Sequence, residues 1–368
     1  MLKSTIVKDL DWGSIVDNSQ EQGMSCLLYR DLKNNNKEIS LPDGIRKELK
    51  ENYFNVSATN IFIFSELNKI LKGFSSDKIS VLVLKSAALL EEVYADIGAK
   101  EISDIDFLIK KDELFKIDVV LRKLGFEPYC DWSKYLDVAR CEYINSIIYL
   151  KGQGKIPIVL DLHWHIVNTT FRVYSYADKF NMDKFWEKAE KNTVAGVDTL
   201  VLAPHHLLIH ACEHLLSHSY QRLVLFYDIF KIIDYYENEI NWKVFIEDAG
   251  KFGIEKTVYY GLYFARELTG AQVPKYVLDS LVPVRFSYPE RKIINLIKKG
   301  KTFGQLRHFF YFFLCTNSRG KIEYIWRSLF PPREMLVYRY KIPLQSIRIQ
   351  HYLLQFKKIF QRIFDILT

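Results

Sequence analysis

Two acidic residues stand two positions apart at the start of an apolar stretch, in Ser103-Asp104-Ile105-Asp106-Phe107. Strand side chains alternate between two faces, so a strand here would point Asp104 and Asp106 to the same side. Two carboxylates on one face suit Mg²⁺, which prefers oxygen ligands and completes its coordination with phosphate oxygens. The structural alternative is that Asp104 caps the beginning of the strand and Asp106 is merely exposed at its end. A motif this short does not separate the two interpretations by itself.

A third acid, Asp161, lies inside another apolar stretch, Val159-Leu160-Asp161-Leu162-His163-Trp164. An isolated carboxylate buried in a strand is energetically expensive, so Asp161 needs a cation, a metal ion or water beside it. His163 and His165 would share its strand face. Either histidine would contact a substrate or hydrogen-bond the carboxylate of Asp161.

A lysine and a serine, Lys85 and Ser86, precede the acid pair at the point where an apolar stretch ends and helical spacing begins. The first turn of a helix offers backbone N–H groups and the positive end of the helix dipole, and both favour phosphate. Lys85 adds a positive charge and Ser86 a hydroxyl. The sequence therefore predicts a phosphate-binding turn near the carboxylates.

The elements that would position these side chains follow from the apolar periodicity. Strands are expected at residues 79–84, 105–109, 143–150 and 158–166, with helices at 87–94 and 112–124. A turn containing two glycines and a proline, at 151–157, joins the last two strands. This order of elements predicts an α/β domain.

Helical spacing dominates the rest of the chain. Four parts are expected: an N-terminal helical region at 1–75, the α/β domain at 76–170, a helical domain at 171–318 and a basic helical tail at 319–368. In the helical domain His206, His210, His214 and His218 recur every four residues, which stacks them on one side of a helix. This face has three interpretations: a structural zinc site, a packed or hydrogen-bonded helix face, or a wall that faces the substrate.

The composition is that of a globular protein of 368 residues, with 49% hydrophobic and 26% charged residues. The five cysteines are scattered without metal-finger spacing, which favours buried thiols in a reducing compartment. The charged N-terminus does not resemble a signal peptide, and no apolar window is long enough to span a membrane. We therefore expect a cytoplasmic protein.

The positive charge is concentrated at the end of the chain. Residues 319–368 contain ten lysines and arginines against three acids, which equals the whole formal net charge of +7. The last stretch, 352–367, also has helical apolar spacing with Lys357, Lys358 and Arg362 beside the apolar side. Either this helix packs on the body of the protein, or it contacts an anionic partner such as a membrane surface or a nucleic acid.

Several blocks, taken in order, resemble the poorly characterised bacterial nucleotidyltransferase family of the DNA polymerase β superfold. The blocks are Lys85 to Leu90, Tyr94, Ser103 to Asp106, Gly125-Phe126 and Leu160 to Trp164, and the likeness continues through His214, His218, Arg222, Asp228 and Phe330 to Glu334. The resemblance implies an α/β (α+β) fold: a nucleotidyltransferase palm with a mixed sheet, flanked by N-terminal helices and a C-terminal helical domain.

The resemblance also implies an activity and site residues. The activity is transfer of a nucleoside monophosphate from a triphosphate such as ATP to an acceptor, with release of pyrophosphate. The implied residues are Asp104, Asp106 and Asp161 as catalytic ligands of Mg²⁺ or Mn²⁺, Lys85, Ser86, Lys100 and Ser103 for the nucleotide, and His163, His214, His218 and Arg222 as a substrate wall. A second metal ion shared by the three carboxylates, or Asp161 acting as base, would activate the acceptor hydroxyl.

Two positions depart from the family pattern. Ser86 stands where the family has glycine, and Lys100 stands where it has arginine, which keeps the charge but loses the planar fork. The sequence therefore carries two functional hypotheses: a metal-dependent nucleotidyltransferase, or a degenerate palm that binds a nucleotide or a partner without turnover. The residues do not choose the nucleobase or the acceptor.

Overall fold

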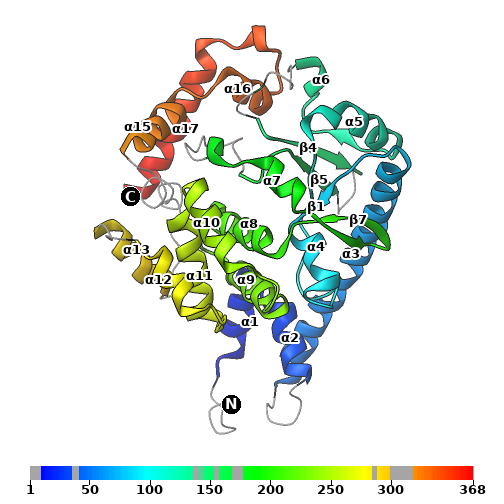
Figure 1. The fold of residues 1–368 in the computed structure, drawn as a ribbon, viewed down its shortest axis with the longest axis vertical. Helices are drawn as coiled ribbons and strands as arrows, with labels where there is room; N and C mark the ends of the chain where they lie inside the picture. The colour runs from blue at the N-terminus through cyan, green and yellow to red at the C-terminus, as the bar shows by residue number, and fades with distance from the viewer. Residues whose placement is uncertain are drawn as a thin grey trace.

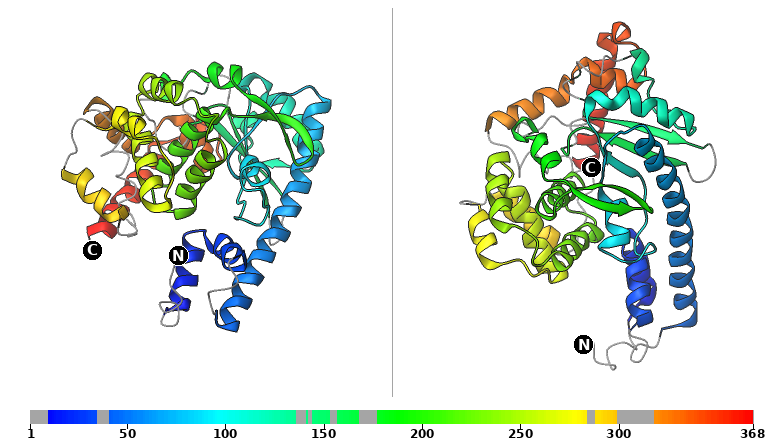
Figure 2. Two further views of the ribbon diagram at one scale, coloured as in Figure 1. Left: turned by 60° about the horizontal axis from the view of Figure 1, so that its bottom comes forward. Right: turned by 45° about the vertical axis from the view of Figure 1, so that its right-hand side comes forward.

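The computed structural model describes residues 10–34, 41–135, 141, 144–152, 157–167, 177–283, 288–298 and 318–367. The chain begins with three helices, α1 (Trp12–Glu21), α2 (Ser25–Asn34) and α3 (Asp43–Ser76). Asp11 begins α1 by accepting a hydrogen bond from the Ser14 amide, which satisfies one free N–H of the first turn. The long α3 buries Leu67, Ile70 and Phe74 at helical spacing and runs beside the sheet (Figure 2).

The core of the protein is a mixed sheet of seven strands in the order β3-β4-β5-β2-β1-β7-β6. The strands are β1 (Leu82–Val83), β2 (Ile105–Leu108), β3 (Glu127–Pro128), β4 (Ser146–Lys151), β5 (Ile158–His163), β6 (Glu190–Val194) and β7 (Val197–Val201). β2 pairs with β5 and β1 pairs with β7 in parallel, and the other neighbours are antiparallel. The expected mixed α/β fold is confirmed.

Helices cover the sheet and extend to one side of it (Figure 1). Between the strands lie α4 (Lys85–Glu92), a 3₁₀ turn (Lys111–Glu113), α5 (Leu114–Lys123) and α6 (Trp132–Tyr135). After β5 come a 3₁₀ turn (Ala177–Lys179), α7 (Met182–Glu187), α8 (Pro204–Ser217), α9 (Leu223–Tyr235), α10 (Trp242–Phe252), α11 (Glu255–Thr269), α12 (Lys275–Leu281) and α13 (Tyr288–Lys298). Helices α8, α9 and α11 pack on one another.

The last part of the chain comprises α15 (Ser318–Leu329), α16 (Arg333–Tyr340), a 3₁₀ turn (Leu344–Ser346) and α17 (Ile349–Leu367). Helix α16 buries Leu336, Val337 and Tyr338, and the Ile148 amide of β4 donates a hydrogen bond to the Tyr338 hydroxyl at 3.2 Å. This part of the basic segment therefore belongs to the body of the protein. Within the described ranges, none of the helices combines the length and apolar character that a membrane span requires.

A hairpin that the sequence analysis did not expect completes one side of the sheet. β6 and β7 fall in the segment expected to be helical, and they are joined at Ala195 and Gly196, which have φ angles of +51° and +71°. Positive φ at both central residues is typical of the tight turns whose twist matches a hairpin. The strands are short and polar, so their sequence lacks a clear alternation of apolar residues.

The boundaries proposed for the four parts of the chain stay predictions.

The other expected elements agree with the structure in place, with ends shifted by a few residues. The strand expected at 79–84 is reduced to β1, and the start of the strand expected at 143–150, like most of the 151–157 turn, lies outside the described residues. Cys26, Cys130 and Cys212 are buried free thiols, as expected, Cys141 is also buried, and Cys315 lies outside the described residues.

Candidate active site

The parallel pairing of β2 with β5 brings two carboxylates together. In this register Asp106 lies opposite Asp161, and Ile105 lies opposite Leu160. Asp104 directly precedes β2 and lies near Asp106, so burial and the Asp106 charge both raise its pKa. The three acids that the sequence singled out therefore converge at one place in the sheet.

Lys85 neutralises the most buried of these acids. Its Nζ lies 2.6 Å from Oδ1 of Asp106, whose side chain is only 2% exposed. Burial alone would raise the pKa of Asp106, but the charges of Lys85 and His163 hold it well below its usual range. Lys85 begins α4 directly after β1 with a φ of +52°, a left-handed conformation that costs a residue with a Cβ about 1–2 kcal/mol. The turn between strand and helix thus directs a strained lysine to the carboxylates.

His163 bridges the two facing acids. Its Nε2 lies 2.9 Å from Oδ1 of Asp106 and 3.1 Å from Oδ2 of Asp161. Burial alone would lower the pKa of His163, but the carboxylates of Asp161 and Asp106 outweigh burial and raise it to about 9. His163 makes the contact with Asp161 that was one of its two interpretations, and its contact with a substrate stays a prediction. His165 instead points to the carbonyl of Ala177, at 3.2 Å.

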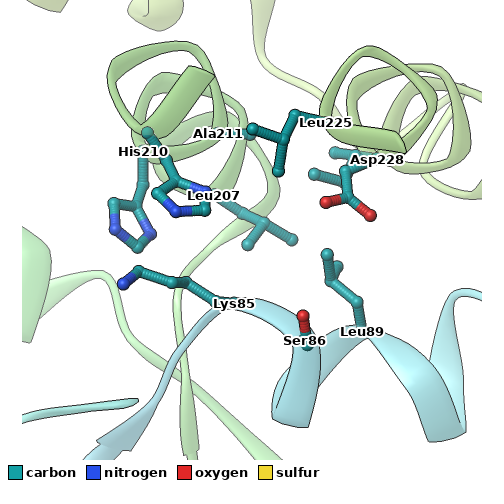
Figure 3. A pocket seen from close by; sticks show the side chains of 10 residues that line it. Lys85, Ser86, Leu89, Leu207, His210, Ala211, Leu225 and Asp228 are labelled. Atoms are coloured by element: carbon teal, nitrogen blue, oxygen red, sulfur yellow. The ribbon is translucent and has the colours of Figure 1, made fainter. Parts of the chain in front are cut away.

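A cavity of about 300 Å³ opens beside this cluster. The residues of its lining that the sequence had singled out are Lys85, Ser86, Lys100, Ser103, Asp104, Asp106, His214, His218 and Arg222. Figure 3 shows the adjoining hollow, where Lys85 and Ser86 at the start of α4 face His210 on α8 and Asp228 on α9. The predicted site residues thus meet at one cavity, apart from Asp161 and His163, which adjoin it through Asp106.

Lys100 lies at the cavity but its charge is already paired. The Nζ atom lies 2.5 Å from Oδ1 and 2.7 Å from Oδ2 of Asp228, and both side chains are buried. The Tyr94 hydroxyl donates a further hydrogen bond, 2.6 Å long, to the same carboxylate. Lys100 therefore fixes α9 against the segment before β2, and its contact with a nucleotide stays a prediction.

The two serines are placed differently. The Ser103 hydroxyl donates a hydrogen bond to Oδ1 of Asp104 at 2.7 Å, so it orients that carboxylate. Ser86 lines the cavity, and the positive φ of this turn falls on Lys85 rather than on Ser86. The serine in place of the family's glycine therefore creates no left-handed strain at its own position.

The histidines of α8 split between two surroundings. His214 and His218 line the cavity with ring centroids 4.7 Å apart, whereas His206 points to Asp248 of α10. Burial lowers the pKa of His210 to about 3, and it lowers that of His214 well below its ordinary value. Within the described part of the chain, His210, His214 and His218 do not form a metal-ligating group. Burial therefore favours the neutral form of His210 and His214.

One wall of the cavity comes from the N-terminal helices, which the sequence analysis had not connected with the site. Its residues are Gln20, Gly23, Ser25, Cys26, Asn52 and Val56. The turn between α1 and α2 touches the start of α9: the amides of Leu223 and Val224 donate to the side chain and the carbonyl of Gln22, at 3.1 and 3.2 Å. None of these residues belongs to a catalytic motif, so only tertiary structure could reveal them.

The carboxylate cluster fits a divalent metal ion. Asp106, Asp161 and His163 each offer one ligand atom, and these atoms lie within 4.8 Å of one another. Oδ1 of Asp161 is buried without a hydrogen-bond partner in the described structure. A buried carboxylate oxygen normally has a partner, so this atom has an unused capacity that a metal ion would fill.

The comparisons with known proteins give one family and two solved structures to which this chain is similar. The family described as uncharacterised nucleotidyltransferase matches residues 8–270. Among solved structures, the antibiotic-resistance factor ANT(2'')-Ia is 9% identical, with 57% of this chain and 98% of that chain covered and a TM-score of 0.33. An antigenic nucleotidyltransferase-like protein from Paracoccidioides brasiliensis is 13% identical, with 63% and 93% covered and a TM-score of 0.33. No curated protein matches the chain.

Proposed function

The chain belongs to the family of uncharacterised nucleotidyltransferases, and we propose that it transfers a nucleoside monophosphate from a nucleoside triphosphate to an acceptor with release of pyrophosphate. The observation that carries this proposal is the convergence of Asp104, Asp106 and Lys85 on one cavity. Carboxylates and a cation at the start of a helix are the groups that a triphosphate with its metal ion requires.

The metal ion is Mg²⁺ or Mn²⁺ in this proposal, held by Asp104, Asp106 and Asp161. When bound, it would neutralise charge on the phosphate oxygens and lower the pKa of the attacking hydroxyl. The unpartnered Oδ1 of Asp161 supports its assignment as an oxygen ligand or as the base that accepts the acceptor proton.

The chain's own cations bind and orient the triphosphate. Lys85 and Ser86 line the cavity at the start of α4, where the helix dipole also favours phosphate. Among the described residues no carboxylate lies within ion-pair distance of Arg222, which lines the same cavity. Its guanidinium is therefore free to bind anionic oxygens of the nucleotide or the acceptor in a bidentate manner.

A second candidate function is nucleotide binding without turnover. It is favoured by one observation: Lys85 and His163 both contact the same oxygen of Asp106, so two cations already satisfy that carboxylate. Incubation with each labelled triphosphate and Mg²⁺ separates the two. Pyrophosphate release that is lost in Asp161→Asn supports the enzyme, whereas saturable binding without pyrophosphate supports the binding protein.

The basic C-terminal segment is the proposed contact for an anionic partner. On α17 the side chains of Lys357 and Lys358 are exposed, as are the apolar Leu353 and Phe360 on the same helix. Removal of α17 should then weaken retention on an anionic matrix and reduce its salt dependence. Unchanged retention would remove the reason to assign a partner to this segment.

A further inference from the structure

A second group of metal-ligating side chains lies where α8 meets α10, outside the lining of the cavity described above. His205 and His206 stand in the first turn of α8, and Asp248 comes from α10. Each of the three offers one ligand atom, and these atoms lie within 4.8 Å of one another. The three residues are 9%, 1% and 3% exposed, and the side chains of His206 and Asp248 are 1% and 5% exposed.

Both imidazoles have a nitrogen without a partner. Nε2 of His205 and Nδ1 of His206 are buried, and neither has a hydrogen bond in the described structure. The other nitrogen of His206, Nε2, lies 3.3 Å from Oδ2 of Asp248, which is longer than most N–H···O hydrogen bonds. Hydrogen bonding within the protein therefore leaves this buried cluster incompletely satisfied.

The spacing suits a tetrahedral ion. Ligand atoms about 2.0 Å from a zinc ion are about 3.3 Å from one another in a tetrahedron, and the distance between His206 Nε2 and Asp248 Oδ2 equals this value. We propose that His205, His206 and Asp248 form a zinc-binding site. Two imidazoles and one carboxylate are a ligand set that Zn²⁺ accepts and Mg²⁺ does not favour.

The surroundings of Asp248 leave one oxygen for the ion. Lys184 of α7 lies 3.1 Å from Oδ1, while Oδ2 faces His206. The His206 ring also stacks on Phe185, with ring centroids 4.2 Å apart, and this contact holds the imidazole in its orientation. Three protein ligands leave a fourth position for water or another donor.

A zinc ion here would tie together two helices beside the candidate active site. It would hold the start of α8 against α10, and α8 also carries His210 and His214, which line the hollow beside Lys85 and Ser86. This zinc site does not depend on the proposed nucleotidyl transfer. Its ligands are separate from the carboxylates Asp104, Asp106 and Asp161 that would hold the catalytic metal ion.

The test is zinc affinity, measured on the full chain after removal of metals, by competition with a chromophoric chelator. The background is Asp161→Asn, which removes a ligand from the other candidate cluster. We expect one tightly bound equivalent and a higher melting temperature with zinc. His205→Gln and Asp248→Asn should each weaken zinc binding at least about 100-fold, whereas His210→Gln, the loss of another buried imidazole of α8, should not. Equal affinity in all these variants would overturn the proposal.

A second variant moves the affinity in the opposite direction. Lys184→Met removes a positive charge beside the ligand carboxylate, so zinc should bind roughly tenfold more tightly. Unchanged or weaker binding would show that Asp248 is not a ligand. Because the Lys184→Met measurement keeps all three proposed ligands, it remains decisive if His205→Gln fails to fold.

Titration with Co²⁺ should give visible absorption bands of a four-coordinate site, and their absence would also refute the site.

Discussion

Asp106 and Asp161 are register partners on two parallel strands, and a single imidazole, that of His163, lies within 3.1 Å of both carboxylates. Two like charges held together in a buried place repel each other unless cations lie beside them. Lys85 and His163 supply those cations in the absence of substrate. The arrangement couples the catalytic chemistry proposed for this site to the stability of the sheet.

Asp104→Asn and Asp106→Asn should separate catalysis from stability. Asp106 is the buried partner of Lys85, so its charge contributes to stability as well as to the proposed metal site. Loss of its charge removes the carboxylate 2.6 Å from the Lys85 ammonium and leaves only the charges of Asp104 and Asp161 near it, so Asp106→Asn should lower the free energy of unfolding by about 3 kcal/mol. The pKa of Asp104 is raised by burial and by Asp106, so its charge is unfavourable and Asp104→Asn should be as stable as the unaltered protein, or more so.

Both variants should lose about 10³-fold in metal-dependent turnover. Denaturant unfolding and pyrophosphate release, measured on the same preparations, provide the comparison. Full activity in Asp104→Asn would contradict the assignment of this carboxylate to the metal.

Asp161→Asn should reduce turnover more than nucleotide binding. Its unpartnered oxygen is assigned to the acceptor side of the reaction rather than to the triphosphate. We expect kcat to fall about 10²- to 10⁴-fold, as for loss of a general base, while the Kd of a non-hydrolysable triphosphate changes by less than about tenfold. Equilibrium binding and steady-state kinetics measure the two quantities separately. An equal loss in both would assign Asp161 to nucleotide binding instead.

Lys100 and Asp228 should behave as a structural pair. Removing either charge alone leaves the other buried without a partner, which costs about 3–5 kcal/mol, whereas Lys100→Met combined with Asp228→Asn should recover part of that loss. Unfolding free energies of the two single variants and the double variant form the cycle. If the double variant regains stability but loses triphosphate affinity more than tenfold, Lys100 also contacts the nucleotide.

The sequence predicted those parts of the site that local patterns determine. Alternation placed Asp104 and Asp106 together, and a strand-to-helix transition placed Lys85 near them. Pairings between distant segments carry no local pattern, so the sequence showed neither that Asp228 would neutralise Lys100 nor that His163 would bridge two acids. The β6–β7 hairpin was missed for a related reason: its burial depends on β1, not on its own apolar alternation.

Glu213 should make the protein less stable as the pH rises. Burial raises the pKa of this α8 carboxyl group to about 8, well above its usual value of 4.5. Between these two pH values the folded protein keeps a proton that the unfolded chain releases. The stabilising contribution is therefore complete below about pH 4.5 and is lost progressively up to about pH 8, with a slope approaching 1.4 kcal/mol per pH unit.

Glu213→Gln should remove this pH dependence. Unfolding by denaturant at a series of pH values would compare the two proteins, and the variant should be the more stable one above pH 8. Parallel stability curves for the two proteins would show that Glu213 is ionised at neutral pH in the folded state.

Gly23 should control the position of Arg222 across the cavity. Its φ is +71°, and a Cβ added there would lie 2.8 Å from Nη2 of Arg222 and 2.9 Å from Cγ1 of Val224. Gly23→Ala therefore has to displace the guanidinium that is proposed to bind the substrate. We expect KM for the triphosphate or the acceptor to rise about tenfold with a smaller change in kcat, because binding is lost rather than chemistry.

Gly270→Ala is the matched control: its φ is +77°, but no atom lies within 4 Å of the added Cβ. Both variants should lose about 1 kcal/mol of stability from backbone strain, and only Gly23→Ala should change KM. Equal kinetics in the two variants would mean that the N-terminal turn does not position Arg222 for substrate.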